Sequence, residues 1–165
     1  MVVARYEDDT MLLREAFAGF PCGVAALAAV VDREPTVLIA SSFTVGVSQD
    51  PPLVAFAVQR SSSTWPELTR AETIGVSVLG ETHAPVTRQL AARDKAARFA
   101  GIEYAESDSG AIFLPGAPVW LECTVAHTYP AGDHDLIVLQ VQGLGHDFGH
   151  QPLVWHRAGF ATLVA

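Results

Sequence analysis

An alternating run from Val119 to Tyr129 restricts the folds open to this chain more than any other stretch. Residues at odd positions, such as Leu121 and Cys123, fall on one side of the run, while those at even positions, such as Glu122, fall on the other. A period of two places successive side chains on opposite faces of an extended chain, so the run predicts a long β-strand. The chain is therefore expected to build its core on β-structure.

The other strands are predicted from β-branched and apolar runs separated by short, turn-rich connections. They fall at residues 24–31, 36–42, 53–58, 73–79 and 136–141, and a closing hairpin is expected over residues 152–156 and 159–164. Short helices are expected over residues 10–17 and 83–93 and after residue 64. Because strands follow strands instead of alternating with long helices, the pattern favours a mainly-β fold with short helices, a closed or split antiparallel barrel, over a doubly wound sheet. Residues 1–165 are expected to form a single domain.

The composition argues against several classes of partner. The formal net charge is −8 at pH 7 and the chain has no Lys/Arg cluster, which disfavours nucleic acid and an anionic membrane surface as partners. No apolar run is long enough to cross a bilayer, and residues 1–9 carry acids where a signal peptide would be apolar. Cys22 and Cys123 are too few for a disulfide scaffold, so we expect two buried thiols in a cytoplasmic protein.

A loop dense in hydroxyl groups is predicted between the strands at residues 36–42 and 53–58. It contains Ser41, Ser42, Thr44 and Ser48 and ends on Asp50-Pro51-Pro52. Such a loop presents short donors and backbone N–H groups on a rigid β-scaffold, as the rim of a site for a planar, polar-edged ligand would. The alternative is an ordinary connection in which the hydroxyls bond only to nearby backbone.

A second hydroxyl-rich segment, Arg60 to Thr64, precedes a short helix. A helix N-terminus offers free N–H groups to a phosphate, and the serines and Arg60 would add hydroxyls and charge. The alternative is a plain N-terminal cap, because Thr64 and Glu67 have the spacing of a capping box.

Other kinds of site find little support. Five of the six histidines follow residue 126, but His146 and His150 lie in a Gly-containing stretch unlikely to be helical, and no cysteine is near enough to complete a zinc-like set. We therefore predict no metal site. The chain has neither a G-x-G-x-x-G turn in a βαβ unit nor a G-x-S-x-G nucleophile turn, which argues against a Rossmann dehydrogenase and an α/β-hydrolase.

Taken together, these segments resemble the short-chain flavin reductases of two-component monooxygenases. The resemblance spans roughly residues 15–163 and rests mainly on the S-F-T…D-P-P-L-V stretch beginning at Ser42 and on the turn Gly132-Asp133-His134. The chain departs from it in one place: Thr44 and Ser48 are separated by one residue more than in many relatives. Which hydroxyl meets the flavin edge is therefore open.

The resemblance implies the FMN-binding split barrel, a Greek-key fold that forms a homodimer with the flavin in a groove between the subunits. It further implies hydride transfer from NADH or NADPH to FMN or FAD, with reduced flavin supplied to a transiently bound partner monooxygenase. His134 would be the catalytic residue that positions the nicotinamide, and His156 would line the nicotinamide side. The residues it implies at the flavin and its phosphate are Ser41, Ser42, Phe43, Thr44, Ser48, Arg60, Ser61, Ser62, Ser63, Thr64, Arg98, Phe99 and His156.

Several alternatives stay open at this point. Arg98 and Phe99 can equally be a surface charge and a core aromatic residue, and the turn at His134 can be a solvent-facing hairpin turn. The same fold could serve as a non-catalytic or electron-storing flavoprotein that holds FMN tightly, or as a binding module for another planar ligand. The sequence separates neither FMN from FAD nor NADH from NADPH.

Overall fold

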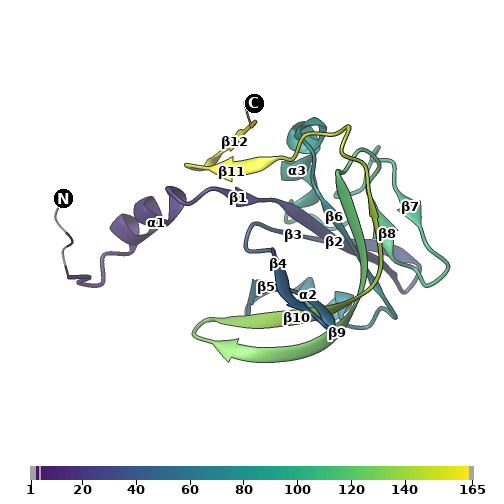
Figure 1. Cartoon of the computed structure of the whole chain (residues 1–165), viewed down its shortest axis with the longest axis horizontal. Coiled ribbons are helices and arrows are strands. Elements are labelled where there is room, and N and C mark those ends of the chain that lie inside the picture. Colours follow the sequence, from purple (N-terminus) through teal and green to yellow (C-terminus); the bar gives the residue numbers. More distant parts are fainter. Residues whose placement is uncertain (1–2, 4, 164–165) are drawn as a thin grey trace.

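The computed structural model describes residue 3 and residues 5–163 of the chain. Its largest sheet has seven antiparallel strands in the order β3-β2-β6-β9-β10-β5-β4, and the sheet curls round a central core (Figure 1). The mainly-β antiparallel fold predicted from the sequence is confirmed. The strands are β2 (Ala25–Val31), β3 (Glu34–Ala40), β4 (Thr44–Gln49), β5 (Pro52–Gln59), β6 (Ile74–Val78), β9 (Val119–Ala131) and β10 (His134–His146).

The barrel closes between β3 and β5 through a side chain. Ser42, just after β3, accepts a hydrogen bond from the Ala57 N–H at 3.0 Å, and its hydroxyl donates to the Ala57 carbonyl, also at 3.0 Å. No ladder between β3 and β5 is present in the described part of the chain. We call this opening the split; it leaves backbone groups of both strands near the surface, where a ligand can use them.

Shorter elements pack around the barrel. A three-stranded sheet joins β1 (Cys22–Gly23), β11 (Val154–His156) and β12 (Gly159–Ala161), and β7 (Ala105–Glu106) pairs with β8 (Ile112–Phe113). The sequence pattern treated residues 104–110 as irregular and so missed β7. Residue 164, the predicted end of the closing hairpin, lies outside the described residues. The α-helices are α1 (Thr10–Ala18), α2 (Trp65–Leu68) and α3 (Ala84–Leu90), the last shorter than the predicted 83–93.

Two apolar clusters lie on either side of β2. Leu27 belongs to the cluster inside the barrel with Phe56, while Ala26 and Ala28 belong to the outer cluster with Leu114. These side chains are almost fully buried. The prediction that this strand is buried on both faces is confirmed, and its alanines fit because a strand packed on both sides has little room for larger side chains.

The β9–β10 hairpin shows the alternation read from the sequence. Leu121 and Cys123 are buried, whereas Glu122 between them is only half-buried on the opposite face. Beyond the core the hairpin continues as a ribbon whose side chains, such as Tyr129, are exposed. Gly132 and Asp133 form its tip, and His134 is already the first residue of β10.

The segment predicted as an open loop after Ser42 contains strand β4. Thr44 pairs with Ala55 and Ser48 pairs with Leu53 on β5, with an irregularity between the two pairs. The β-branched Val45 and Val47 favour extended backbone, and Gly46, at φ +73°, supplies the irregularity. The loop prediction was therefore wrong for residues 44–49, which form an edge strand.

Close packing fixes the short strand β8 against β6. A Cβ atom added at Gly75 would lie only 2.2 Å from the backbone oxygen of Ile112, so a larger residue at position 75 could not be accommodated without movement of the backbone. Helix α1 differs, because it projects from the barrel with no buried residue (Figure 1). None of the helices in the described part of the chain is both long and apolar enough to cross a membrane.

Candidate active site

A cavity of about 470 Å³ opens at the split. One wall is the end of β3 and the residues after it, the other is the end of β5 and the following turn, and β10 contributes its first residue. The cavity gathers these residues from segments that the sequence marked independently: Ser41, Ser42, Ser61, Ser62 and His134. The remaining lining residues come mainly from the apolar stretches of β3 and β5.

The cavity serines differ in how their hydroxyls are used. Ser42 is occupied by its two hydrogen bonds to Ala57. Ser62 accepts from the N–H of Trp65, the first residue of α2, at 3.1 Å and keeps its own hydrogen to donate. Ser41 and Ser61 are exposed, and neither hydroxyl bonds to another described residue. Ser41 and Ser61 are thus the side chains most available to a ligand.

Two basic side chains that do not line the cavity hydrogen-bond to the serine segment. Lys95 Nζ donates to the Ser63 carbonyl at 2.9 Å and to Glu67 Oε1 at 2.7 Å. Arg98 Nη1 donates to Thr64 Oγ1 at 3.0 Å and to the Val37 carbonyl at 2.8 Å. Partial burial lowers the pKa of Arg98 from its ordinary value, opposed by the charge of Glu67, but a guanidinium stays protonated at physiological pH. Positive charge therefore lies against the Ser63 carbonyl and the Thr64 hydroxyl, with that of Lys95 shared with Glu67.

The predicted capping box at α2 is wrong. Thr64 is buried and makes no side-chain bond to the helix N-terminus, because its hydroxyl oxygen accepts from Arg98. Glu67 is bound to Lys95 instead of reaching back to the cap. Both members of the expected pair are used to fasten residues 95–98 to the serine segment.

Arg60 links the serine segment to β10. Its Nε donates to Asp135 Oδ1 at 2.9 Å, and its backbone N–H donates to the Asp133 carbonyl at 3.1 Å. The pair is about half exposed at Arg60, so its contribution to stability is small. Its effect is geometric, because it keeps the serine segment beside His134.

His134 is oriented by the residue before it. Its Nδ1 lies 2.7 Å from Asp133 Oδ1. The hydrogen bond from His134, followed by the attraction of its positive charge, lowers the pKa of the Asp133 carboxyl, which remains ionised at neutral pH. A carboxylate on Nδ1 favours a proton there and leaves Nε2 as the second contact atom of the imidazole. Since the ring lines the cavity, it can hydrogen-bond a bound molecule.

Comparison with known proteins assigns this arrangement to a family. Residues 17–164 match the flavin reductase like domain. The chain is 32% identical over 164 residues to a flavin reductase of Pseudomonas putida, covering 99% of this chain and 95% of the relative. It is 38% identical over 157 residues to the actinorhodin polyketide dimerase of Streptomyces coelicolor, covering 94% and 87%. The NADH:FAD oxidoreductase of Streptomyces globisporus C-1027, solved with NAD and FAD fragments, matches with a TM-score of 0.88 at 29% identity, covering 98% of both chains.

This chain belongs to the flavin reductase like family. The family predicted from the S-F-T…D-P-P-L-V and Gly132-Asp133-His134 segments is confirmed. The prediction of an NAD(P)H-dependent flavin reductase agrees with relatives that include an NADH-dependent flavin reductase of Rhodococcus. The structural neighbours include the flavin reductase components of a tryptophan halogenase and a styrene monooxygenase.

The groove of this flavin reductase like chain continues beyond the split cavity through Ser41. A neighbouring cavity of about 500 Å³ shares Ser41 and Ser42 and is walled by Phe17, Phe20, Cys22 and Trp155, among others. A third, of about 280 Å³, shares Ser41 and Trp155 and is bounded by Arg88 on α3. Sequence reasoning did not select these aromatic residues. No local signal marked them, because Phe20 and Trp155 are brought together only by the pairing of β1 with β11.

Several predicted site residues lie outside the split cavity. Thr44 and Ser48 are in β4, Phe43 packs against the inner core cluster, and Phe99 packs edge-on against Tyr104 with ring centroids 5.1 Å apart. His156 ends β11 next to Trp155. Arg60, Ser63, Thr64 and Arg98 support the wall without lining it.

The cysteines and histidines have separate roles. Cys123 is buried as expected, and burial raises the pKa of its thiol to about 12, but Cys22 is only half-buried and lines the aromatic part of the groove. His146 stacks on Phe148 with ring centroids 4.4 Å apart, and His150 faces Asp147. Within the described residues, no group of three or more His, Cys, Asp or Glu side chains could hold a metal ion.

Proposed function

We propose that this member of the flavin reductase like family oxidises NADH or NADPH and passes the hydride to a flavin, either FMN or FAD. The reduced flavin then leaves for a partner monooxygenase. One observation carries the proposal: a single cavity brings together serines of both hydroxyl-rich segments and His134, the last residue of the Gly132-Asp133-His134 turn. These are the segments that a flavin phosphate, a flavin ring edge and a nicotinamide nucleotide would need to contact.

The residues at the split fit a flavin. Its phosphate needs donors and positive charge. Ser61 lines the cavity, and Arg98 bonds to Thr64, three residues further along the same segment. Its ring needs donors at the polar edge and apolar contact on the faces, which Ser41 and the adjoining aromatic part of the groove supply. The bound flavin itself supplies the hydride-accepting chemistry.

The protein's own part in catalysis is binding and orientation. We propose that His134, held by Asp133, donates a hydrogen bond to the nicotinamide nucleotide and fixes it against the flavin. Fixing two reactants in one geometry removes much of the entropic barrier to their reaction. Phe43, Thr44, Ser48, Phe99 and His156 remain proposed contacts that would be made from outside the split cavity.

We further propose that a second copy of the chain completes the groove, as a homodimer. Exposed apolar side chains support this, namely Met11 and Phe17 on α1, Val45 on the edge strand β4 and Tyr129 on the β9–β10 hairpin. Surfaces of this kind commonly pack against another chain. We also propose that the chain is a single domain of a cytoplasmic protein, with Cys22 and Cys123 as free thiols.

The proposal is tested by mixing the protein with each pairing of FMN or FAD with NADH or NADPH and following the loss of nicotinamide absorbance. Steady turnover with at least one pairing is expected, and no turnover with any of them would exclude the proposal. The second candidate, a flavin-holding protein without reductase activity, predicts a yellow protein that keeps its colour through gel filtration and does not consume NADH.

A further inference from the structure

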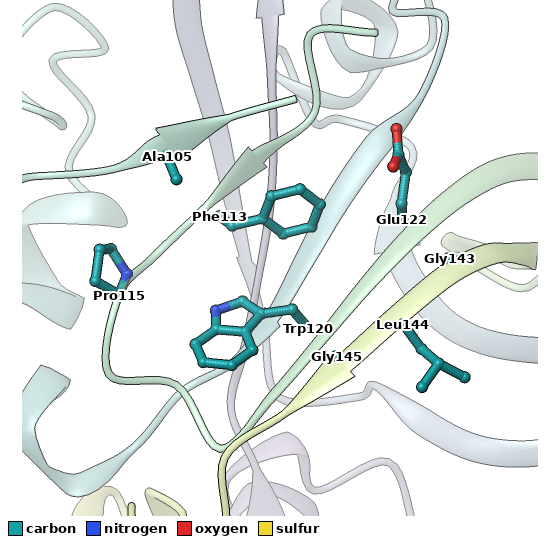
Figure 2. Close-up of a pocket in the computed structure, with 8 residues that line it drawn as sticks. All are labelled: Ala105, Phe113, Pro115, Trp120, Glu122, Gly143, Leu144 and Gly145. Atoms are coloured by element: carbon teal, nitrogen blue, oxygen red, sulfur yellow. The ribbon is translucent and has the colours of Figure 1, made fainter. Parts of the chain in front are cut away.

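A separate cavity of about 550 Å³ lies on the outer face of β9, opposite the buried Leu121 and Cys123. Figure 2 shows the rings of Phe113 and Trp120 between Pro115 on one side and Glu122 and Leu144 on the other. It shares no residue with the cavity at the split. The lining residues are Ala105, Phe113, Pro115, Trp120, Glu122, Gly143, Leu144 and Gly145.

The carboxylate of Glu122 is charged, and only one of its two oxygens is hydrogen-bonded to described residues. Its Oε1 accepts hydrogen bonds from Thr73 at 2.8 Å and Ser107 at 3.2 Å, and from Ser109. These bonds, with that from Ser109 the strongest influence, lower the pKa of Glu122 from its ordinary value, so the group is an anion at neutral pH. Oε2 makes no hydrogen bond to any described residue and faces Gly143, where an added Cβ would lie 3.8 Å away.

The floor of the cavity is left open by two glycines on β10. Neither has the left-handed backbone that favours glycine, and a Cβ at Gly145 would meet Trp120 Cε3 at an ordinary 3.7 Å. A Cβ at Gly143 would be 3.7 Å from Glu122 Cβ, again an ordinary contact. Neither backbone conformation nor packing therefore requires glycine here, and larger side chains would fill the space above Trp120 and Glu122.

The aromatic wall is held in a fixed orientation. Trp120 Nε1 donates to the Leu114 carbonyl at 2.8 Å, which prevents the indole from turning away. Phe113 is half-buried beside it on β8, and no basic side chain lines the cavity. Aromatic faces attract a cation placed within about 6 Å of the ring centre, and more strongly when a carboxylate lies beside them.

We propose that this cavity binds a small organic ammonium ion, with its charged nitrogen on Glu122 Oε2 and its apolar body against Trp120 and Phe113. The volume is in the range of small-molecule sites, which is about 300–1,000 Å³. The net charge of −8 favours a cation over an anion at this surface. The site lies outside the groove assigned to flavin and does not depend on that assignment.

The test measures calorimetric binding of three probes of similar shape near neutral pH: 2-phenylethylammonium, 2-phenylethanol and phenylacetate. Saturable binding of the ammonium ion with a Kd of about 1 mM or lower is expected, at least about tenfold tighter than the alcohol, with no binding of phenylacetate. Because this comparison uses the unaltered protein, it does not depend on whether a variant folds. Equal affinity for the ammonium ion and the alcohol, or no saturable binding, would overturn the proposal.

Two variants locate the site. Glu122→Gln keeps the size of the side chain and an oxygen for the three hydroxyls, and should weaken ammonium binding about tenfold. Gly145→Val should abolish it by filling the floor beside Trp120. The matched control is Glu106→Gln, an exposed acid on β7 that does not line the cavity. Unchanged binding in Glu122→Gln, in protein that still reduces flavin or retains its β circular dichroism spectrum, would place the ammonium ion elsewhere and refute the proposal.

Discussion

The cavity at the split and the cavity on the outer face of β9 offer opposite chemistry, although both open beside strands of the same barrel. At the split, the hydroxyls of Ser41 and Ser61 are free, and Lys95 and Arg98 place positive charge behind the serine segment. On the outer face of β9, the hydroxyls of Thr73 and Ser107 donate to Glu122 Oε1. This leaves Oε2 without a described hydrogen-bond partner, in a cavity that two aromatic rings also line. The first arrangement suits an anionic nucleotide and the second a cation. What a site can bind thus depends on which polar groups are already satisfied, and a count of hydroxyls alone does not reveal it.

The largest effect is expected at His134. His134→Ala should lower kcat/KM for NADH about 100-fold, because a hydrogen bond to a charged group is worth about 1.5–3 kcal/mol. FMN affinity should stay within about threefold, since the serines and cations remain. Steady-state kinetics and fluorescence titration give the two quantities. His127→Ala is the control, an exposed histidine on the same hairpin that does not line the split cavity. Equal losses in both variants would contradict the role of His134.

A smaller effect should separate the phosphate end of the groove from the ring end. Ser61→Ala should raise the Kd for FMN about tenfold, because a hydroxyl that donates to a phosphate is lost. Riboflavin, which lacks the phosphate, should bind the variant and the parent protein equally. Fluorescence quenching of each flavin supplies the measurement. If riboflavin binding weakened as much as FMN binding, Ser61 would contact the ring or ribityl chain instead.

Ser41 and Ser42 test whether adjacent hydroxyls serve binding or folding. Ser42→Ala should lower the free energy of unfolding by about 1–2 kcal/mol, because Ala57 loses both of its hydrogen bonds to the side chain. Ser41→Ala should change stability by less than about 0.5 kcal/mol yet weaken flavin binding. Denaturant unfolding and flavin titration of both variants would show the contrast, and the reverse pattern would show that the two roles have been exchanged.

The smallest effect concerns thiol reactivity. Only a thiolate reacts readily with an alkylating agent, and the pKa of Cys123, raised to about 12 by burial, keeps that group protonated at physiological pH. Iodoacetamide should therefore modify Cys22 alone in the native protein, as mass spectrometry can detect. Bound FMN should slow that reaction, because Cys22 lines the groove. Modification unaffected by saturating FMN would mean that the flavin does not reach the aromatic part of the groove.

Much of this fold was predictable because strand alternation is a local signal. The run at 119–129 and the apolar stretch at 24–31 could be read directly, since burial on one or both faces leaves a visible pattern. Strand β4 could not, because its hydroxyls and Gly46 look like a loop and only its pairing with β5 extends it. The capping box suggested by the spacing of Thr64 and Glu67 does not form for a similar reason, because the partner of the Thr64 hydroxyl, Arg98, lies 34 residues away.

The candidate site was predictable in its polar part and missed in its apolar part. Ser41, Ser61 and His134 stand in short segments whose composition is unusual, so each could be selected without knowledge of the fold. Phe20 and Trp155 meet only because β1 pairs with β11, a contact between distant parts of the chain that no local pattern encodes. Aromatic residues in a core and in a ligand groove look the same in a sequence.

The close packing at Gly75 also fixes part of the wall of the cavity on β9. Gly75 lines neither cavity, yet it packs directly against β8. A Cβ atom at position 75 would lie 2.2 Å from the backbone oxygen of Ile112, and β8 carries Phe113 and leads to Pro115. An alanine at this position would push β8 and the residues that follow it away from β6. A substitution at Gly75 would therefore change the shape of the proposed ammonium site through Phe113 and Pro115.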